Sequence, residues 1–259
     1  MPTNLPSVSR FTAPGAIFPG DPRKTPTLIA AFWLWRDIVR GVFEPGERLK
    51  VQLLSRFYEI GHTPIREAIA RLLATGLVLH EQDRGHRVAP VSVDDYMDVL
   101  DVFLRLRRLA LNIAIARGDE AWEARIVAQL HRSLKVRAVA PGDDPEQREL
   151  WQRAYGDLQG ELIGGCCSPS LIRILRDIGA RAERYGNLFA DYGAELQRDH
   201  AGEHREMVGA LIARDGARVQ ALLDAADVLA EPLRASVVEA LKRRVDTAPT
   251  GRRRRRSPA

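Results

Sequence analysis

Two adjacent cysteines are the first residues of a type that can do chemistry. Cys166 and Cys167 are the only cysteines in the chain. Neighbouring cysteines make a strained disulfide and a poor metal-ligand set, so we expect neither a disulfide framework nor a zinc finger. Because Ser168 follows at a predicted helix start, where the pKa of a thiol falls, a reactive thiol is the functional interpretation. We favour two small, buried packing residues instead.

Two histidines form a second candidate site, for a metal ion. His200 and His204 are four residues apart, a spacing that places both on one face of a helix and can chelate a transition metal. Asp199 or Asp227 would have to complete such a site. The alternative interpretation is that His200 and Glu203 are exposed and that His204 is a hydrogen-bonded core histidine.

A run of five arginines dominates the charge of the chain. The net charge is +5, and Arg252 to Arg256 alone supply five positive charges, so the rest of the chain is close to neutral. We expect residues 246–259 to be a disordered basic tail, because a like-charge run next to proline and serine does not fold by itself. Non-specific attraction to nucleic acid is the functional alternative for this tail.

Composition narrows the class of protein. The 259 residues are 45% apolar and 28% charged, as in globular proteins, and their number suits two domains. Apolar stretches such as Leu28 to Trp35 are far shorter than the roughly 20 residues of a membrane span, and Met1 to Lys24 does not resemble a signal peptide, so we expect a cytoplasmic protein. The sequence lacks a Gly-x-Ser-x-Gly elbow, a phosphate-binding loop, a His-Glu-x-x-His pair and a dinucleotide-binding glycine pattern, so we expect no enzyme.

The first part of the chain predicts a winged helix-turn-helix over residues 26–90, behind a proline-rich flexible arm of residues 1–25. Apolar residues recur with helical spacing from Leu28 until Gly41 ends the pattern, and a second, shorter helix follows over residues 52–58. Thr63 is expected to cap a third helix, with Pro64 in its first position. Two short strands around a glycine-bearing turn, residues 77–79 and 87–89, then form the hairpin.

The second part predicts an all-α bundle of six or seven helices over residues 91–245, so the fold class is mainly α. Ser92 and Asp95 form a capping box that opens a long helix ending near Arg117. Only helical patterns follow, at about residues 119–137, 145–164, 168–188, 190–214 and 217–243. We find no internal repeat, which argues against a solenoid.

A winged helix-turn-helix predicts where DNA would be contacted. The N-terminal turn of the third helix would present His62, Thr63 and Arg66 to base edges, because this helix enters the major groove. Arg48, Lys50 and Arg56 would contact phosphates, and the wing tip, Arg84, Gly85 and His86, would approach the minor groove. The alternative is a protein-docking module in which these side chains are only solvated surface.

The same region closely resembles the N-terminal domain of GntR-family transcriptional regulators. The matching residues are Ile38, Gly41, Pro45–Leu49, Thr63–Ile69, Leu72, Gly76–Val78, Arg84, Gly85 and Val88. The resemblance implies a regulator that binds double-stranded DNA. The family usually has a Ser-Arg pair where this chain has Gly61 and His62, and often an arginine where it has Gln52. Neutral histidine is a weaker guanine reader than arginine, so readout would rely more on Arg66 and the wing.

The bundle resembles the FCD class of this family, whose domains dimerise and hold a small organic or sugar acid, frequently beside a divalent metal. The metal ligands of that class, one aspartate and three histidines, fall on Tyr155, Gln159, His204 and Ala226. Only His204 is retained, so we expect no metal cofactor, with the pair His200 and His204 as the one alternative.

Without a metal, an acidic effector needs cationic groups inside the bundle. Arg107 and Arg184 match family arginines and are the candidates, because arginine binds carboxylate bidentately. An ordinary salt bridge is the alternative for Arg107. Tyr155, Gln159 and Asn187 could add neutral hydrogen bonds, which completes the expected ligand site together with His204.

The expected oligomeric state follows from how little DNA one winged helix can contact. One module contacts one half-site, so a two-fold dimer on a pseudo-palindromic operator gains both affinity and discrimination. We expect the bundle to form a homodimer, since Leu104, Ile113 and Ile115 lie on more than one face of its first helix. The competing hypothesis is an architectural DNA-binding protein that has no effector.

Overall fold

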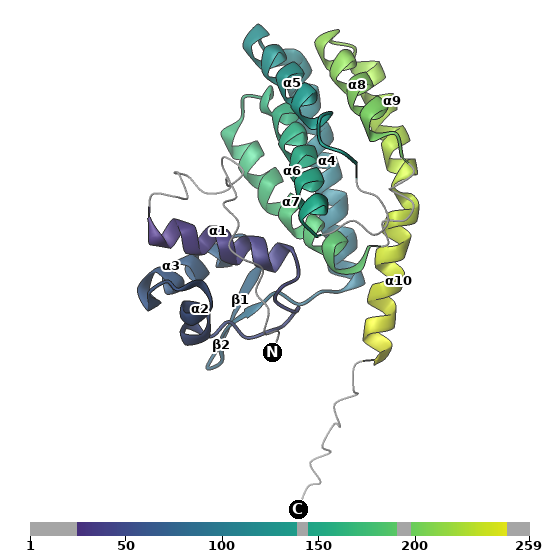
Figure 1. Cartoon of the computed structure of the whole chain (residues 1–259). Coiled ribbons are helices and arrows are strands. Elements are labelled where there is room, and N and C mark those ends of the chain that lie inside the picture. The colour runs from purple at the N-terminus through teal and green to yellow at the C-terminus, as the bar shows by residue number, and fades with distance from the viewer. Residues whose placement is uncertain (1–24, 139–144, 191–197, 248–259) are drawn as a thin grey trace, which may run out of the picture.

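The computed structural model describes residues 25–138, 145–190 and 198–247. Within these ranges the chain forms ten helices and one two-stranded sheet. The first three helices and the sheet lie together, and the other seven helices form a taller bundle beside them (Figure 1). The fold class predicted from the sequence, mainly α with a winged helix-turn-helix in front of a helical bundle, is confirmed.

The first domain contains α1 (Pro26–Val39), α2 (Val51–Tyr58), α3 (His62–Leu73), β1 (Val78–Glu81) and β2 (Gly85–Val88). Its core is built from the apolar faces of the three helices and the two strand ends that pack on them, and Leu34, Ile38, Ile65 and Leu72 are fully buried there. The two strands are antiparallel, with Val78 opposite Val88. Burying the apolar faces of α1 and α3 against each other leaves the outer face of α3 in solvent.

The start of α3 differs from the prediction. The helix begins at His62 and its N-cap is Gly61, so Thr63 lies inside the first turn and caps nothing. The chain turns early because Glu59 adopts a left-handed conformation, with φ of 56°, at the end of α2. Pro64 therefore occupies the third helical position, which still lacks an intrahelical partner for an N–H group.

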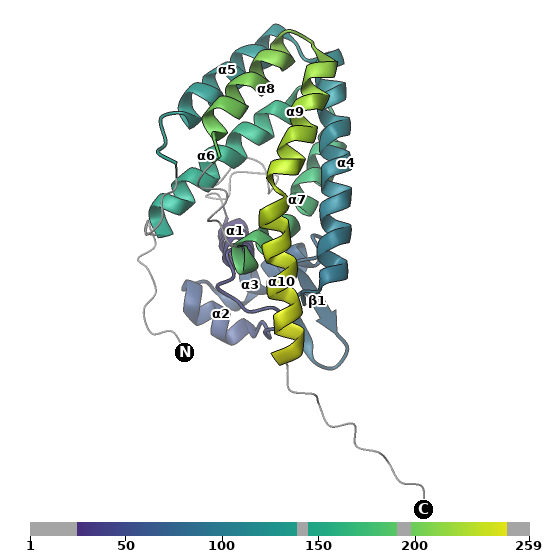
Figure 2. The same ribbon diagram turned by 90° about the vertical axis from the view of Figure 1, so that its right-hand side faces the viewer.

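The bundle contains seven helices: α4 (Val93–Arg117), α5 (Glu120–Ser133), α6 (Pro145–Gly164), α7 (Pro169–Phe189), α8 (His200–Ile212), α9 (Gly216–Leu229) and α10 (Glu231–Thr247). Half of the capping box predicted for α4 is confirmed, because the Ser92 hydroxyl accepts a hydrogen bond from the backbone N–H of Asp95. The carboxylate of Asp95 does not complete the box and instead accepts hydrogen bonds from Arg181 and Tyr185. Figure 2 shows α8 to α10 on the side of the bundle away from α1.

The last predicted helix, over residues 217–243, is in fact two helices. α9 ends at Leu229 and α10 begins at Glu231, with Ala230 between them. Pro232 in the first turn of α10 explains the break, because proline has no N–H to continue the ladder of α9 and its ring crowds the preceding turn. The two helices nevertheless run along one side of the bundle (Figure 2).

Helix α7 joins the two parts of the molecule. The side-chain amide of Asn187 donates a hydrogen bond to the carbonyl of Val39 at the end of α1, at 3.0 Å. Gly41, with φ of +77°, lies so close to Leu188 that a Cβ atom there would be 2.5 Å from its Cδ2 atom. The first domain therefore packs directly on the bundle.

No helix in the described ranges is both long enough and apolar enough to cross a membrane.

Candidate nucleic-acid interface and helical-domain site

The N-terminal turn of α3 is free of neighbours on its outer face. His62, Thr63 and Arg66 are all exposed, whereas Ile65 and Ile69 on the opposite face are buried. The helix thus keeps its position through its apolar face and presents polar side chains and its positive dipole end to solvent. This arrangement suits entry into a DNA groove and contact with phosphate.

A short extended segment places two further basic residues beside the wing. The backbone N–H of Leu49 donates to the carbonyl of His86 at 2.9 Å, and the N–H of Val88 donates to Glu47 at 2.9 Å. Arg48 and Lys50 on this segment are exposed next to the hairpin. The pairing of this segment with β2 is a feature that the sequence pattern did not reveal.

The second helix adds two of the expected contacts on its solvent side. Gln52 and Arg56 are both exposed on α2. With arginine replaced by an amide at position 52, this turn offers a hydrogen-bond donor where the family often has a charge.

The wing tip is only partly as expected. Arg84 and Gly85 are exposed, and Gly85 has φ of +79°, which glycine adopts without strain. His86 is half-buried, and its ring centroid is 5.0 Å from that of His80 on the opposite strand. Burial and then the neighbouring His80 lower the pKa of His86, so this side chain is neutral at pH 7 and adds no positive charge at the wing.

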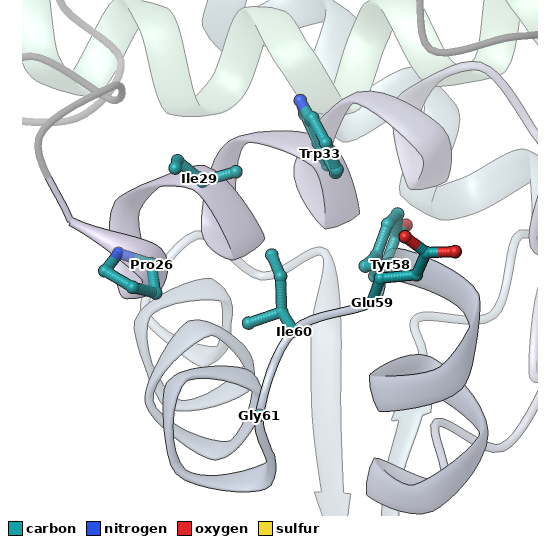
Figure 3. A pocket seen from close by; sticks show the side chains of 7 residues that line it. All are labelled: Pro26, Ile29, Trp33, Tyr58, Glu59, Ile60 and Gly61. Carbon is teal, nitrogen blue, oxygen red and sulfur yellow. The ribbon is translucent and has the colours of Figure 1, made fainter.

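A separate hollow of about 430 Å³ lies between α1 and the turn that joins α2 to α3 (Figure 3). Ile29 and Trp33 line it from α1, Tyr58 lines it from the end of α2, and Glu59 and Ile60 line it from the turn. Its walls are apolar and its one charged side chain is a carboxylate, so it is not a surface for nucleic-acid phosphate.

In the bundle, side chains from three helices meet. A guanidinium nitrogen of Arg107 on α4 donates a hydrogen bond to the amide oxygen of Gln159 on α6, at 2.7 Å. The amide nitrogen of Gln159 lies 3.5 Å from Nε2 of His204 on α8. Three of the six expected ligand residues, 45 to 97 positions apart in sequence, therefore form one polar chain.

Aromatic rings border this polar chain. The ring of Tyr155, a fourth expected ligand residue, lies 5.0 Å from that of His204 and 6.0 Å from that of His200. Trp151 completes the group at 5.7 Å from Tyr155 and 5.1 Å from His200. Sequence reasoning missed Trp151, although its spacing of four residues from Tyr155 on a helix would have placed both on one face.

His204 is uncharged in this setting. Burial, and then the neighbouring His200, lowers the pKa of His204 to about 4. At neutral pH its imidazole therefore acts as a hydrogen-bonding group and supplies no positive charge. His200 is buried rather than exposed, which contradicts that part of the alternative interpretation of the histidine pair.

Arg184 lies apart from this group. It is buried at the junction of the two domains, where it donates a hydrogen bond to the carbonyl of Ala89 at 2.6 Å. Burial lowers the pKa of Arg184 to about 10. Asn187 is also at this junction, where it accepts a hydrogen bond from Gln152 at 3.0 Å. The structure thus brings neither residue to the cluster around His204.

The residues at the expected metal position do not fit a divalent cation. Over the described parts of the chain, no three histidine, cysteine or acidic side chains converge. Of the two acids that could complete the histidine pair, Asp199 caps α8 through the N–H of Gly202, and Asp227 pairs with Arg108 and Arg234. The amide of Gln159 faces the ring nitrogen of His204 that a metal would need.

The cysteine pair is split between two environments. Cys166 is buried in the bundle core, as expected for a packing residue, but Cys167 is exposed and the expectation was wrong there. Cys167 has φ of 52° and immediately precedes Ser168, the N-cap of α7, so its side chain points outward from a tight turn. Arg252 to Arg256 lie outside the described residues.

Two family models match this chain in the order of its two domains. The model of bacterial regulatory proteins of the gntR family matches residues 33–88, and the FCD domain model matches residues 98–226.

Curated relatives agree with these models. The HTH-type transcriptional repressor GlaR of Escherichia coli (strain K12) is 30% identical over 194 residues, which are 74% of this chain and 87% of that protein. The uncharacterized HTH-type transcriptional regulator BphR of Paraburkholderia xenovorans (strain LB400) is 33% identical over 187 residues, 72% of this chain and 76% of that protein.

Solved structures share the fold. E. coli McbR/YncC has a TM-score of 0.61 at 16% identity, covering 85% of this chain and 99% of that one. A putative transcriptional regulator GntR from Rhodococcus sp. RHA1 has a TM-score of 0.57 at 20% identity, covering 83% and 98%.

Proposed function

Since the chain belongs to the GntR family of bacterial regulatory proteins and is a transcriptional regulator with an FCD domain, we propose that it binds an inverted-repeat operator as a homodimer and responds to a small organic acid.

The exposed first turn of α3 supports the DNA contacts. The other face of this helix is buried in the core, and His62, Thr63 and Arg66 are exposed, which supports their proposed contact with base edges. Exposed polar side chains on α2, on the segment before it and on the wing are proposed to contact DNA phosphates, as in a helix-turn-helix complex: Arg48, Lys50, Gln52, Arg56 and Arg84.

The dimer is supported by the needs of recognition and by apolar surface on the bundle. One module reads too few base pairs to discriminate its site from a genome, and two-fold symmetry doubles the reading surface. Among the residues first expected at the interface, Ile113 and Ile115 instead pack partly against the bundle core. Met97 and Leu109, which are 52% and 48% exposed on α4, are the better candidates.

Arg107 is the observation that carries the acid effector. Its guanidinium is partly buried beside Gln159 and His204, and no carboxylate contacts it among the residues that the structure describes. A buried cation without a counter-charge is costly, and a ligand carboxylate would offset that cost. Tyr155 lies close enough to His204 to border the same ligand.

Footprinting combined with light scattering tests the DNA-binding half of this proposal. We expect two protected half-sites related by inverted symmetry and a particle of twice 28.9 kDa at micromolar concentration. A single asymmetric half-site or a monomer would contradict it.

Thermal denaturation against a panel of organic acids tests the effector, because a ligand that binds only the folded state raises the melting temperature. No shift with any acid would instead support the effector-independent architectural protein.

A further inference from the structure

We propose that the cluster of Arg107, Gln159, His204, Tyr155, Trp151 and His200 binds an aromatic monocarboxylate directly, without a metal ion. This inference rests on the proposed response to an organic acid and names the chemical class of that acid. It departs from the metal-assisted site that the family resemblance implies.

Arg107 has no carboxylate partner among the described residues, which indicates that the ligand carries an anionic group. Two other partly buried arginines of the bundle have carboxylate partners: Arg108 pairs with Asp224 and Asp227, and Arg214 pairs with Glu123 at 2.5 Å. Arg107 instead donates to the neutral amide of Gln159. Its planar guanidinium keeps further N–H donors for two carboxylate oxygens.

Charge counting favours one carboxylate over two. Glu203, on the same helix as His204, is held by Arg198 at 2.6 Å and leaves no net charge near the site. Trp151 and Gln159 have no ionisable group, and Arg107 is the one guanidinium that the cluster holds. One arginine therefore balances one carboxylate, and a second buried carboxylate would have no counter-charge.

The aromatic rings of the cluster indicate the chemistry of the other end of the ligand. Trp151, Tyr155, His200 and His204 lie with neighbouring centroids 5.0 to 6.4 Å apart, which is the range of aromatic packing. All but His200 retain partly accessible surface, so they can exchange contacts with a ligand ring. A flat apolar group joined to a carboxylate matches this combination of rings and one cation.

Absence of a metal follows from the same contacts. A divalent cation needs several lone pairs aimed at one point. Here Nε2 of His204 faces an amide nitrogen at 3.5 Å, and Ala226 occupies a position where a ligand would be needed. The guanidinium of Arg107 takes over the task that a metal ion performs for a carboxylate, namely neutralising its charge.

The test measures binding of benzoate, phenylacetate, cyclohexanecarboxylate and succinate by calorimetry and by tryptophan fluorescence. The full-length protein is used in EDTA, after elemental analysis for zinc and nickel. We expect well below one equivalent of metal, binding of the two aromatic acids with a change in tryptophan emission, and at least tenfold weaker binding of cyclohexanecarboxylate and succinate.

Variants separate the two ends of the ligand. Arg107→Gln should weaken benzoate at least tenfold, and Arg107→Lys should restore part of it, since lysine keeps the charge and loses the fork. Arg105→Gln is the matched control, because Arg105 is exposed and paired with Asp101. Tyr155→Leu should erase most of the preference for benzoate over cyclohexanecarboxylate while acid binding persists. Circular dichroism and operator binding establish that each variant is folded.

Each contrary outcome has its own meaning. Equal or better binding of succinate or cyclohexanecarboxylate overturns the aromatic class and leaves the acid effector standing. Binding that requires added zinc or nickel overturns the metal-free site. If no acid of any kind binds a protein that still binds its operator, the acid effector in the proposed function fails, and this inference fails with it.

Discussion

The two domains place their functional side chains in opposite ways. In the first domain, Arg66 and its neighbours are exposed on a single helix turn, and the hydrophobic core holds that helix in place without contributing a side chain to the contact surface. In the bundle, Arg107, Gln159 and His204 come from three helices and are partly buried together. Recognition of a large charged polymer requires an exposed surface, whereas recognition of a small molecule requires enclosure.

This difference determines what a substitution disturbs. Replacing an exposed arginine has little effect on folding, so a change in the variant can be attributed to its affinity for DNA. A residue of the bundle interior contributes to stability and to binding at once.

Trp122→Ala should have the largest effect, on the stability of the bundle. Trp122 is fully buried, its indole N–H donates to the carbonyl of Glu161 at 2.8 Å, and Gly118 and Gly165 lie against its ring. Its loss should lower the free energy of unfolding by about 3–5 kcal/mol in urea denaturation. Trp33→Ala, at a half-buried ring in the first domain, is the control and should cost clearly less. Equal losses would contradict the expectation that the depth of burial sets the cost.

Arg66→Ala should weaken operator binding by about 1–3 kcal/mol per half-site and relax the preference at one base pair, because a base contact is lost. Arg71→Ala, at an exposed arginine in the last turn of the same helix, should leave the preference unchanged. Binding titrations on a library of operator variants give both numbers.

Removal of Arg252 to Arg256 provides the opposite control for Arg66. It should weaken binding to all DNA about equally and reduce the salt dependence of binding. If this truncation and Arg66→Ala lose sequence preference to the same extent, the assignment of Arg66 to a base edge is wrong.

His204→Gln should remove a pH dependence of stability. The pKa of His204 in the folded protein is about 4, below the ordinary value of 6.5. As pH falls from about 6.5 to 4, the unfolded chain takes up a proton that the folded protein refuses, so the free energy of unfolding falls by up to about 1.4 kcal/mol per pH unit. The variant should lose this slope between pH 6.5 and 4, whereas His131→Gln, at an exposed position, should keep it.

Gly41→Ala should have the smallest effect, and it reports on the contact between the domains. Gly41 and Gly46 both have positive φ, of +77° and +84°, so alanine costs about 1 kcal/mol at either position. Only at Gly41 would the new Cβ also meet Leu188 on α7. If Gly41→Ala lowers the free energy of unfolding in urea more than Gly46→Ala does, the difference measures that packing. Equal losses of free energy would show that α7 shifts to accommodate the new Cβ atom.

Local signals explain which elements could be predicted. The capping box at Ser92, the glycine-bearing turn of the wing and the apolar stripe of α3 each depend on residues within a few positions of one another. Their energies act within one turn or hairpin, so the sequence shows them directly. The missed start of α3 came from the left-handed residue Glu59, which has no such signature.

Long-range contacts explain the errors in the candidate site. Arg107 and Arg184 were both candidates because they match family arginines, with an ordinary salt bridge as the alternative for Arg107. Only packing distinguishes them, because Arg107 faces Gln159 whereas Arg184 reaches the carbonyl of Ala89 between the domains. Pro232, in contrast, was a local signal for the break after α9, and it was overlooked.

Helix α6 contacts both the cluster and the first domain. Its residues Tyr155 and Gln159 belong to the cluster. Earlier on the same helix, Gln152 donates a hydrogen bond to Asn187, which in turn binds the end of α1. Glu149 forms an ion pair with Arg40, directly after α1. Equilibrium linkage then imposes reciprocity on the molecule. Whatever factor an effector at the cluster applies to the affinity for operator DNA, the operator must apply the same factor to the affinity for that effector.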